Sequence, residues 1–182
     1  MTAPTAPVLQ LDTVTRVHGD GETAVQALRG VSFAAHAGEL VAIMGPSGSG
    51  KSTLLTLAGG LDSPTSGTVS VEGTDLASLG ANGRARMRRT SIGYVFQDFN
   101  LIPALTAGEN VALPRELDGE GTRSARKLLR ARCDAGAAGV LVTHEARHAA
   151  WADRVVFLRD GVVVDETGAD KVEALVDAGA TR

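Results

Sequence analysis

The residues best suited to chemistry lie in one short stretch, Met44 to Leu55, which reads MGPSGSGKSTLL. Its glycines, lysine and serine match the spacing G-x-x-x-x-G-K-[ST] at every fixed position. Glycines in such a loop let backbone N–H groups turn inward and approach phosphate oxygens closely. The lysine can reach the β- and γ-phosphates of a nucleotide, and the hydroxyl after it can bind Mg²⁺. The pattern predicts a nucleotide phosphate site in which Lys51 carries the charge and Ser52 contacts the metal.

The segments on both sides of this loop are those that a phosphate site needs. Gly38 to Met44 is a continuous apolar run, typical of a strand buried on both faces of a parallel sheet. A helix is predicted from the loop through Leu57, with Gly59 and Gly60 supplying a left-handed cap. The start of that helix adds the positive end of its dipole to the phosphate site. The alternative, a glycine-rich turn that binds nothing, does not account for the lysine or for the strand–loop–helix order.

The remaining pattern predicts an α/β fold with antiparallel strands near the start. Apolar and alternating runs predict strands at residues 8–17, 30–35, 67–73, 91–97 and 140–145. Two apolar runs joined by Asp160 and Gly161 predict a hairpin over residues 154–166. Thr106 and Glu109 form a capping-box pattern at a helix start. Further helices are predicted from about residue 125 and over residues 171–179.

Composition narrows the classes of protein that remain. The chain has 182 residues, enough for one domain with a core, and its net charge of −3 gives no electrostatic reason for a nucleic-acid partner. The arginine run from Arg84 to Arg89 is interpreted as a solvated helix face, and the single Cys133 as an incidental small side chain. Residues 1–7 lack the features of a secretory signal and are expected to be a disordered lead. No apolar run is long enough to cross a bilayer, so a soluble protein is expected, with any membrane role through a partner.

Three separated segments together resemble one family, the ATP-binding subunits of ABC transporters. The first runs from Ala27 to Gly73, the second from Ile92 to Pro114 around the family's glutamine loop, and the third from Val140 to Val164 around its switch histidine. They are most similar to the subgroup that serves lipoprotein-release, macrolide-export and cell-division permeases. The resemblance implies a P-loop NTPase fold of ABC type, as a single domain over residues 8–182. It would have an N-terminal antiparallel β-subdomain and a truncated helical subdomain.

The resemblance also implies residue roles. Gln97 would contact Mg²⁺ and the attacking water and couple the site to the permease, and His144 would hydrogen-bond the γ-phosphate. His18 falls near the family's adenine-stacking aromatic, although a surface-loop histidine is an equal alternative. The implied nucleotide-binding residues are Gly45, Pro46, Ser47, Gly48, Ser49, Gly50, Lys51, Ser52, Thr53 and His18. The implied metal contacts are Ser52 and Gln97.

The cofactors implied are ATP and Mg²⁺. The partners implied are an integral-membrane permease and a second ATP-binding subunit, with no nucleic acid. The expected location is therefore cytoplasmic, at the inner face of the cell membrane through the permease.

Two segments of the family are missing from this sequence. One is the signature segment, similar to Leu-Ser-Gly-Gly-Gln, which caps ATP bound on the partner subunit. The other is an apolar strand ending in Asp-Glu, whose Asp holds Mg²⁺ through water and whose Glu is the general base. The flanking sequences meet near residues 124–127, which indicates an in-frame deletion of several dozen residues. A natural degenerate copy, an error in the gene prediction and a deliberate deletion would leave the same sequence.

The missing segments bear on turnover more than on binding. A positioned general base contributes about 10²–10⁴-fold to the rate, so hydrolysis by this chain alone is not expected, and whether it is an enzyme stays open. Glu145 and Asp98 are the candidates to replace the base. The alternatives are a non-hydrolysing nucleotide-binding module, another phosphate-loop enzyme such as a small-molecule kinase, and a remnant that does not fold. Without the strand that ends in Asp-Glu, either the neighbouring strands close the gap or the sheet presents unpaired edges, and a weakly stable fold is expected.

Overall fold

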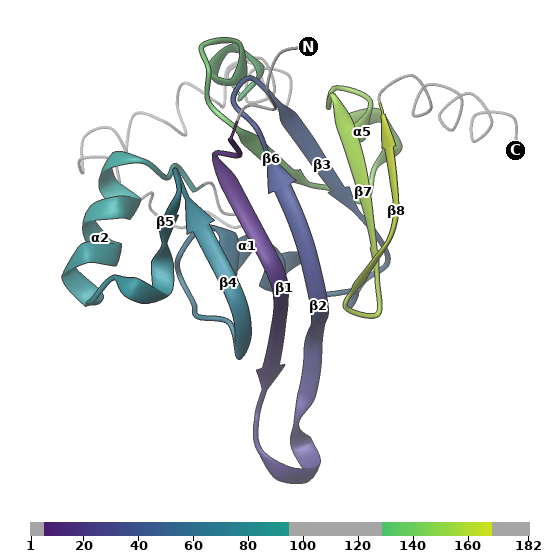
Figure 1. Ribbon diagram of the computed structural model, residues 1–182. Coiled ribbons are helices and arrows are strands. Elements are labelled where there is room, and N and C mark those ends of the chain that lie inside the picture. The colour runs from purple at the N-terminus through teal and green to yellow at the C-terminus, as the bar shows by residue number, and fades with distance from the viewer. Residues whose placement is uncertain (1–5, 95–128, 169–182) are drawn as a thin grey trace, which may run out of the picture.

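The computed structural model describes residues 6–94 and 129–168. In these ranges the chain forms two four-stranded sheets with short helices around them (Figure 1). The antiparallel sheet has the order β2 (Val25–Ala35), β1 (Leu9–His18), β4 (Ser66–Val71) and β5 (Thr74–Asp75). The mixed sheet has the order β6 (Gly139–Val142), β3 (Leu40–Met44), β7 (Arg154–Arg159) and β8 (Val162–Gly168).

Within the described ranges, short α-helices and two 3₁₀ turns connect these strands. The helices are α1 (Lys51–Ala58), α2 (Ala81–Thr90) and α5 (Ala146–Ala149), and the turns are η1 (Gly21–Thr23) and η2 (Leu76–Ser78). Residues 129–134 are also helical and lead through a turn into β6. None of the described helices is long and apolar enough to cross a bilayer.

Strand β3 is the centre of the mixed sheet because its side chains are apolar on both faces. It pairs in parallel with β6 on one side and with β7 on the other. Val41 and Ile43 point into a core shared with the antiparallel sheet and with Leu54 and Leu57 of α1. Leu40 and Ala42 point the other way, into a smaller cluster. The further members of that cluster are Cys133, Ala149, Ala152 and Val155.

Most of the predicted elements are confirmed. The predicted strands correspond to β1, β2, β3, β4 and β6, although β2 begins at Val25, earlier than predicted. Helix α1 ends as expected: Gly60 has φ of 62°, and the N–H of Leu61 donates to Thr56 O at 3.0 Å. Asp160 and Gly161, with φ of 50° and 78°, form the turn between β7 and β8.

The predicted strand over residues 91–97 is wrong in its described part. Ser91 to Tyr94 carry no strand. Ser91 instead donates its N–H to Met87 O and so closes α2, while Ile92 packs against the core. The Tyr94 ring lies so close to Gly59 that a Cβ there would come within 2.6 Å of it. The apolar residues therefore cover the end of α1 without joining a sheet.

Several predicted features lie outside the described residues. They are the end of that strand at residues 95–97, the capping box at Thr106 and Glu109, the helix start near residue 125, the junction at residues 124–127, and the last helix over residues 171–179.

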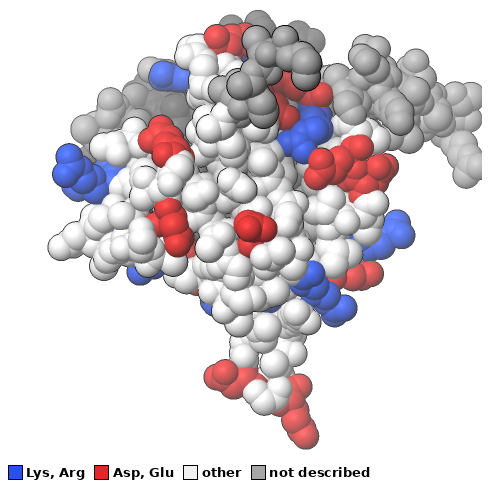
Figure 2. Space-filling view, viewed as in Figure 1, with Lys and Arg blue, Asp and Glu red and all other residues white. Residues whose placement is uncertain are grey.

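On the face drawn in Figure 2, the acidic and basic side chains of the described residues are scattered and form no large patch of one sign. Acidic side chains mark the tip of the loop between β1 and β2, where Asp20 and Glu22 are exposed. Helix α2 carries the arginine run and has no buried residue, as expected of a solvated helix. Two of its arginines reach back to the loop after α1, because Arg84 contacts Ser63 Oγ and Arg88 contacts Gly60 O.

Among the described strands, β6 is one edge of the mixed sheet. β3 pairs directly with β6, from Leu40 opposite Gly139 to Ile43 opposite Val142. Among the described strands, β6 has no partner on its other side. An exposed sheet edge is a liability for self-association.

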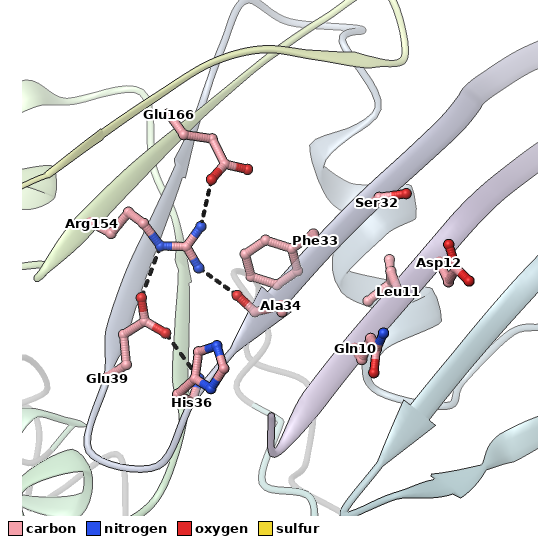
Figure 3. Close-up of a pocket in the computed structure, with 10 residues that line it drawn as sticks. All are labelled: Gln10, Leu11, Asp12, Ser32, Phe33, Ala34, His36, Glu39, Arg154 and Glu166. Carbon is pink, nitrogen blue, oxygen red and sulfur yellow. Dashed lines mark hydrogen bonds and ion pairs between the residues drawn. The ribbon is translucent and has the colours of Figure 1, made fainter. Parts of the chain in front are cut away.

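Arg154 joins the two sheets through one guanidinium group (Figure 3). At the start of β7, it donates to Glu39 Oε1 at 2.8 Å and to Glu166 Oε2 at 2.7 Å. It also donates to Ala34 O on β2 and lies 5.7 Å from the centroid of the Phe33 ring. One cation thus connects the antiparallel sheet with three segments of the mixed sheet.

Replacing Arg154 by Met tests this connection. The change leaves Glu39, whose side chain is 18% exposed, without its main cation. We expect the free energy of unfolding to fall by about 1–3 kcal/mol. Arg159→Met, on the exposed end of the same strand, is the matched control and should change stability by less than about 0.5 kcal/mol. Equal urea midpoints for the two variants would contradict the assignment.

Asp153 ties the helical residues before β6 to the start of β3. Its carboxylate accepts the Leu40 N–H at 2.7 Å and a hydrogen bond from Arg130 at 2.6 Å. Arg130 also bonds Asp134 at 2.8 Å and Gly38 O at 2.8 Å. Although partial burial opposes it, the Leu40 amide and Arg130 together lower the pKa of Asp153.

This lowered pKa predicts an acid dependence of stability. The folded pKa lies below the ordinary value of 3.8, so between the two the unfolded chain binds more protons. The contribution of Asp153 is therefore present above pH 3.8 and is lost as pH falls through the folded pKa. We expect Asp153→Asn to lower stability at neutral pH and to flatten the acid limb of a stability–pH curve. An unchanged acid limb in Asp153→Asn would contradict this.

Candidate functional site

The phosphate-loop sequence forms the turn between β3 and α1, at the carboxyl edge of the mixed sheet. Gly45, Gly48 and Gly50 have φ of 149°, 78° and 99°, values that favour glycine. Gly50 is also the N-cap of α1, and its carbonyl accepts the N–H of Leu54 at 2.8 Å. The helix therefore begins directly at the lysine, with its first amides open to a ligand.

Two of these glycines are required by close backbone contacts. A Cβ on Gly45 would lie 2.0 Å from Leu158 O on β7. A Cβ on Gly50 would lie 2.4 Å from Ala27 O on β2. A Cβ on Gly48, by contrast, would meet nothing within 4 Å. Gly45 and Gly50 thus hold the loop against the sheets, while Gly48 leaves open space above it.

The loop is braced by the turn between β7 and β8, a contact that the sequence reasoning missed. Gly161 donates its N–H to Ser49 O at 3.1 Å, and its own carbonyl accepts the N–H of Arg29 at 2.8 Å. Ser49 is buried, with 2% of its surface exposed. The Asp-Gly pair signalled a turn, but no sequence signal showed where that turn would pack.

Lys51 folds back over its own loop. Its ammonium group donates to Gly45 O at 2.8 Å and to Pro46 O at 2.6 Å, and lies 3.4 Å from Ser49 Oγ. An ammonium group has three donors, so all three have partners in the loop. The positive charge therefore lies over the loop, where a phosphate group would meet it.

His144 reaches the same edge as the loop. It comes two residues after Val142 on β6, as Gly45 comes two residues after Ile43 on β3, and Val142 is paired with Ile43. The N–H of Thr143 extends this pairing by donating to Ile43 O at 3.1 Å. The His144 side chain is exposed. The structure thus brings the predicted γ-phosphate contact next to the phosphate loop.

His18 and Thr53 also lie beside the loop helix. Nε2 of His18, at the end of β1, is 3.4 Å from Thr53 Oγ1 in the first turn of α1. Ser52 is exposed in the same turn. The end of β1 is therefore near the place where a nucleotide bound to the loop would extend, although His18 is an exposed side chain and contacts α1 only through Thr53.

Glu145, one of the two candidate replacements for the base, is already engaged. Its carboxylate bonds Arg147 at 2.5 Å and lies 3.7 Å from Nε2 of His148. The hydrogen bond from Arg147 is the main cause of a lowered pKa for Glu145. A carboxylate with a lowered pKa is a weaker proton acceptor, so this environment does not favour a general base.

The other candidate, Asp98, and the predicted metal contact Gln97 lie outside the described residues. Within the described ranges no three His, Cys, Asp or Glu residues are grouped as metal ligands. The exposed hydroxyl of Ser52 could supply one of several Mg²⁺ ligands. Mg²⁺ usually takes few protein ligands and completes its coordination with nucleotide phosphates and waters.

A separate hollow of about 400 Å³ lies beside Arg154, between the two sheets (Figure 3). Its lining includes Phe33, Glu39, Arg154 and Glu166, and none of the residues of the phosphate loop. The Arg154 charge is already matched by the two carboxylates. We therefore assign the candidate site to the loop and not to this hollow.

Comparison with known proteins decides the family. The sequence profile described as ABC transporter matches residues 28–166. The chain belongs to the ABC transporter family. The resemblance drawn from the three sequence segments is thereby confirmed.

Named relatives include proteins of two of the suggested kinds, macrolide export and lipoprotein release. A macrolide export ATP-binding/permease protein, MacB of Marinobacter nauticus, is 48% identical over 108 residues, covering 59% of this chain and 17% of the relative. The lipoprotein-releasing ATP-binding protein LolD of Hahella chejuensis is 41% identical, covering 67% of this chain and 53% of the relative. The chain thus spans about half the length of LolD. It spans a smaller share of the longer relative MacB.

Solved structures confirm the fold class. A dimeric ATP-binding cassette bound to ADP and phosphate is 30% identical, with a TM-score of 0.70 over 88% of this chain and 98% of that one. The α/β, P-loop NTPase assignment is therefore confirmed, and the short chain agrees with a truncated form of the fold.

The alignment with one relative bears directly on the predicted deletion. The alignment with MacB of Chlorobium luteolum runs over 231 residues at 32% identity and includes 93% of this chain. Because the chain has only 182 residues, at least 49 aligned positions of that relative have no counterpart here. This agrees with an internal loss of several dozen residues.

The loop geometry predicts an order of effects for glycine substitutions. Gly48→Ala should lower the free energy of unfolding by about 1–2 kcal/mol, because only the left-handed backbone opposes it. Gly45→Ala should cost about 1–3 kcal/mol more, because its Cβ would also overlap Leu158 O. Urea denaturation of both variants measures the difference. Equal losses would mean that the loop is not held against β7 as described.

Proposed function

We propose that this chain is the ATP-binding subunit of an ABC-type transporter and that it binds Mg-ATP at the loop from Gly45 to Ser52. The observation that carries the proposal is the position of Lys51 at the start of α1, with its ammonium over Gly45 O and Pro46 O. On binding, the phosphates would take these donors and the open amides of the first helical turn. His144, at the same edge, would contact the γ-phosphate.

The proposed metal contacts are Ser52 and Gln97, with the remaining ligands supplied by phosphate oxygens and water. Mg²⁺ would neutralise charge between the β- and γ-phosphates. His18 would lie beside the adenine ring, which its position near Thr53 supports.

We propose further that the chain binds ATP without turning it over at the family's rate. The sequence lacks the family's signature segment, and its one Asp-Glu pair, Asp165–Glu166, lies on β8, which is antiparallel to β7 and where Glu166 is bonded to Arg154. Arg147 holds the Glu145 carboxylate in a poorly basic form. Loss of a positioned base alone slows phosphoryl transfer by about 10²–10⁴-fold. The second candidate function, a non-hydrolysing nucleotide-binding module, is favoured by this same observation. A degenerate remnant is the remaining alternative.

The partners proposed are an integral-membrane permease and a second ATP-binding subunit. The relatives named for macrolide export and lipoprotein release support this choice. The location that follows is the cytoplasmic face of the cell membrane, reached through the permease. We propose residues 8–182 as one domain, with the junction of the deletion at residues 124–127.

Lys51→Ala tests the binding proposal. Mg-ATP should bind the purified wild-type chain and should bind Lys51→Ala at least about tenfold more weakly, since a charge-assisted contact is worth about 1.5–3 kcal/mol. Isothermal titration measures both. Arg86→Ala, which removes an exposed charge on α2, is the matched control and should leave the affinity unchanged.

Two results would count against the proposal. Equal affinities in wild type and Lys51→Ala would place the nucleotide elsewhere. A wild-type chain that melts cooperatively but binds no Mg-ATP would be a folded domain whose loop does not bind nucleotide. A chain without a cooperative melt would be the remnant that does not fold.

A further inference from the structure

A hydroxyl, an imidazole and a carboxylate close around the peptide that carries His144. Glu145 donates its backbone N–H to Thr143 Oγ1 at 3.1 Å. The same hydroxyl lies 3.5 Å from Nδ1 of His148, and Nε2 of His148 lies 3.7 Å from Glu145 Oε2. The three contacts run in a ring from residue 143 to 145 to 148 and back, and residue 144 lies on the chain that the ring encloses.

This ring is fixed to rigid elements at both ends. Thr143 is buried, with 8% of its surface exposed, and its N–H continues the ladder between β6 and β3. On the other side, the N–H groups of His148 and Ala149 donate to Glu145 O at 3.0 and 3.2 Å and so begin α5. His144 is exposed between two anchored neighbours.

One arrangement of protons is consistent with these contacts. The Thr143 hydroxyl accepts from the Glu145 N–H and donates to Nδ1 of His148. Nδ1 of His148 is then the acceptor, and Nε2 lies on the side of the Glu145 carboxylate. Neither the hydroxyl nor the imidazole is left without a partner.

We propose that Thr143 and His148 are positioning residues that hold His144 toward the γ-phosphate of bound ATP. The inference rests on the proposed function, because it requires a nucleotide on the loop from Gly45 to Ser52. A loop that is already ordered loses less conformational freedom when it binds. The benefit falls on ATP and not on ADP, because only ATP has the γ-phosphate that His144 would contact.

The quantity to measure is the ratio of the Kd for Mg-ADP to the Kd for Mg-ATP, by titration of the full chain. Thr143→Val keeps the side-chain shape and removes the hydroxyl, so the ratio should fall about three- to tenfold, with the Kd for Mg-ADP unchanged. Thr143→Ser restores the hydroxyl and should restore the ratio. Thr68→Val, on the exposed face of β4, is the matched control and should change neither Kd.

His148 gives an independent pair of variants. His148→Ala should lower the ratio as Thr143→Val does. His148→Asn places an amide oxygen where Nδ1 accepted the Thr143 hydroxyl, so it should recover most of the loss. A structural role alone would lower both affinities together and would leave their ratio unchanged.

A double variant tests whether the effect passes through His144. His144→Ala should reduce the ratio, and adding Thr143→Val should then change it no further. A full additional loss in the double variant would mean that Thr143 acts by another route and would overturn the inference.

The positioning role of Thr143 and the proposed nucleotide binding can fail separately. A ratio equal in wild type and Thr143→Val, with Mg-ADP binding intact, would overturn this inference and leave the proposed function standing. Absence of Lys51-dependent Mg-ATP binding in the wild type would overturn both. If Thr143→Val does not bind Mg-ADP, the His148 pair decides: rescue by Asn supports the inference, and equal ratios for Ala and Asn overturn it.

Discussion

The site depends on three stretches of backbone that approach closely at the edge of the mixed sheet. The phosphate loop passes against Leu158 O of β7 at Gly45 and against Ala27 O of β2 at Gly50, where no Cβ would fit. The turn between β7 and β8 then bonds Ser49 O through Gly161. This packing fixes where α1 begins, and so fixes the direction of the amides and of Lys51.

The same edge explains how binding and turnover can be separated. β6 pairs directly with β3, so His144 arrives beside the loop although the family's Asp-Glu strand is missing from the sequence. The groups that would contact phosphate come from β3, α1 and the end of β6, all of them retained. The resemblance places the water-activating group on a segment that this sequence lacks, and the Glu145 carboxylate is bonded to Arg147. Under the proposed function, the chain would bind the nucleotide without the group that transfers the proton.

Sequence reasoning succeeded where the signal is local. The glycine spacing of the loop, the Gly60 cap and the Asp160–Gly161 turn each follow from the conformational needs of a few neighbouring residues.

Sequence reasoning failed where tertiary contacts decide the structure. Nothing near Arg154 in the sequence predicts its bonds to Glu39 and Ala34, which are distant along the chain. Ile92 and Tyr94 have the pattern of a strand, but Ile92 packs against the core and Tyr94 packs against the end of α1. The Thr143–Glu145–His148 ring likewise needed the fold to be seen.

The most direct test of the account is a single-turnover experiment with the chain in excess over Mg-ATP labelled at the γ-phosphate. The nucleotide bound to the wild type should remain ATP, with phosphate release no faster than in Lys51→Ala. Binding would then be separated from hydrolysis in one sample. Release of phosphate that Lys51→Ala abolishes would contradict the account. Hydrolysis would then require a general base from another part of the chain.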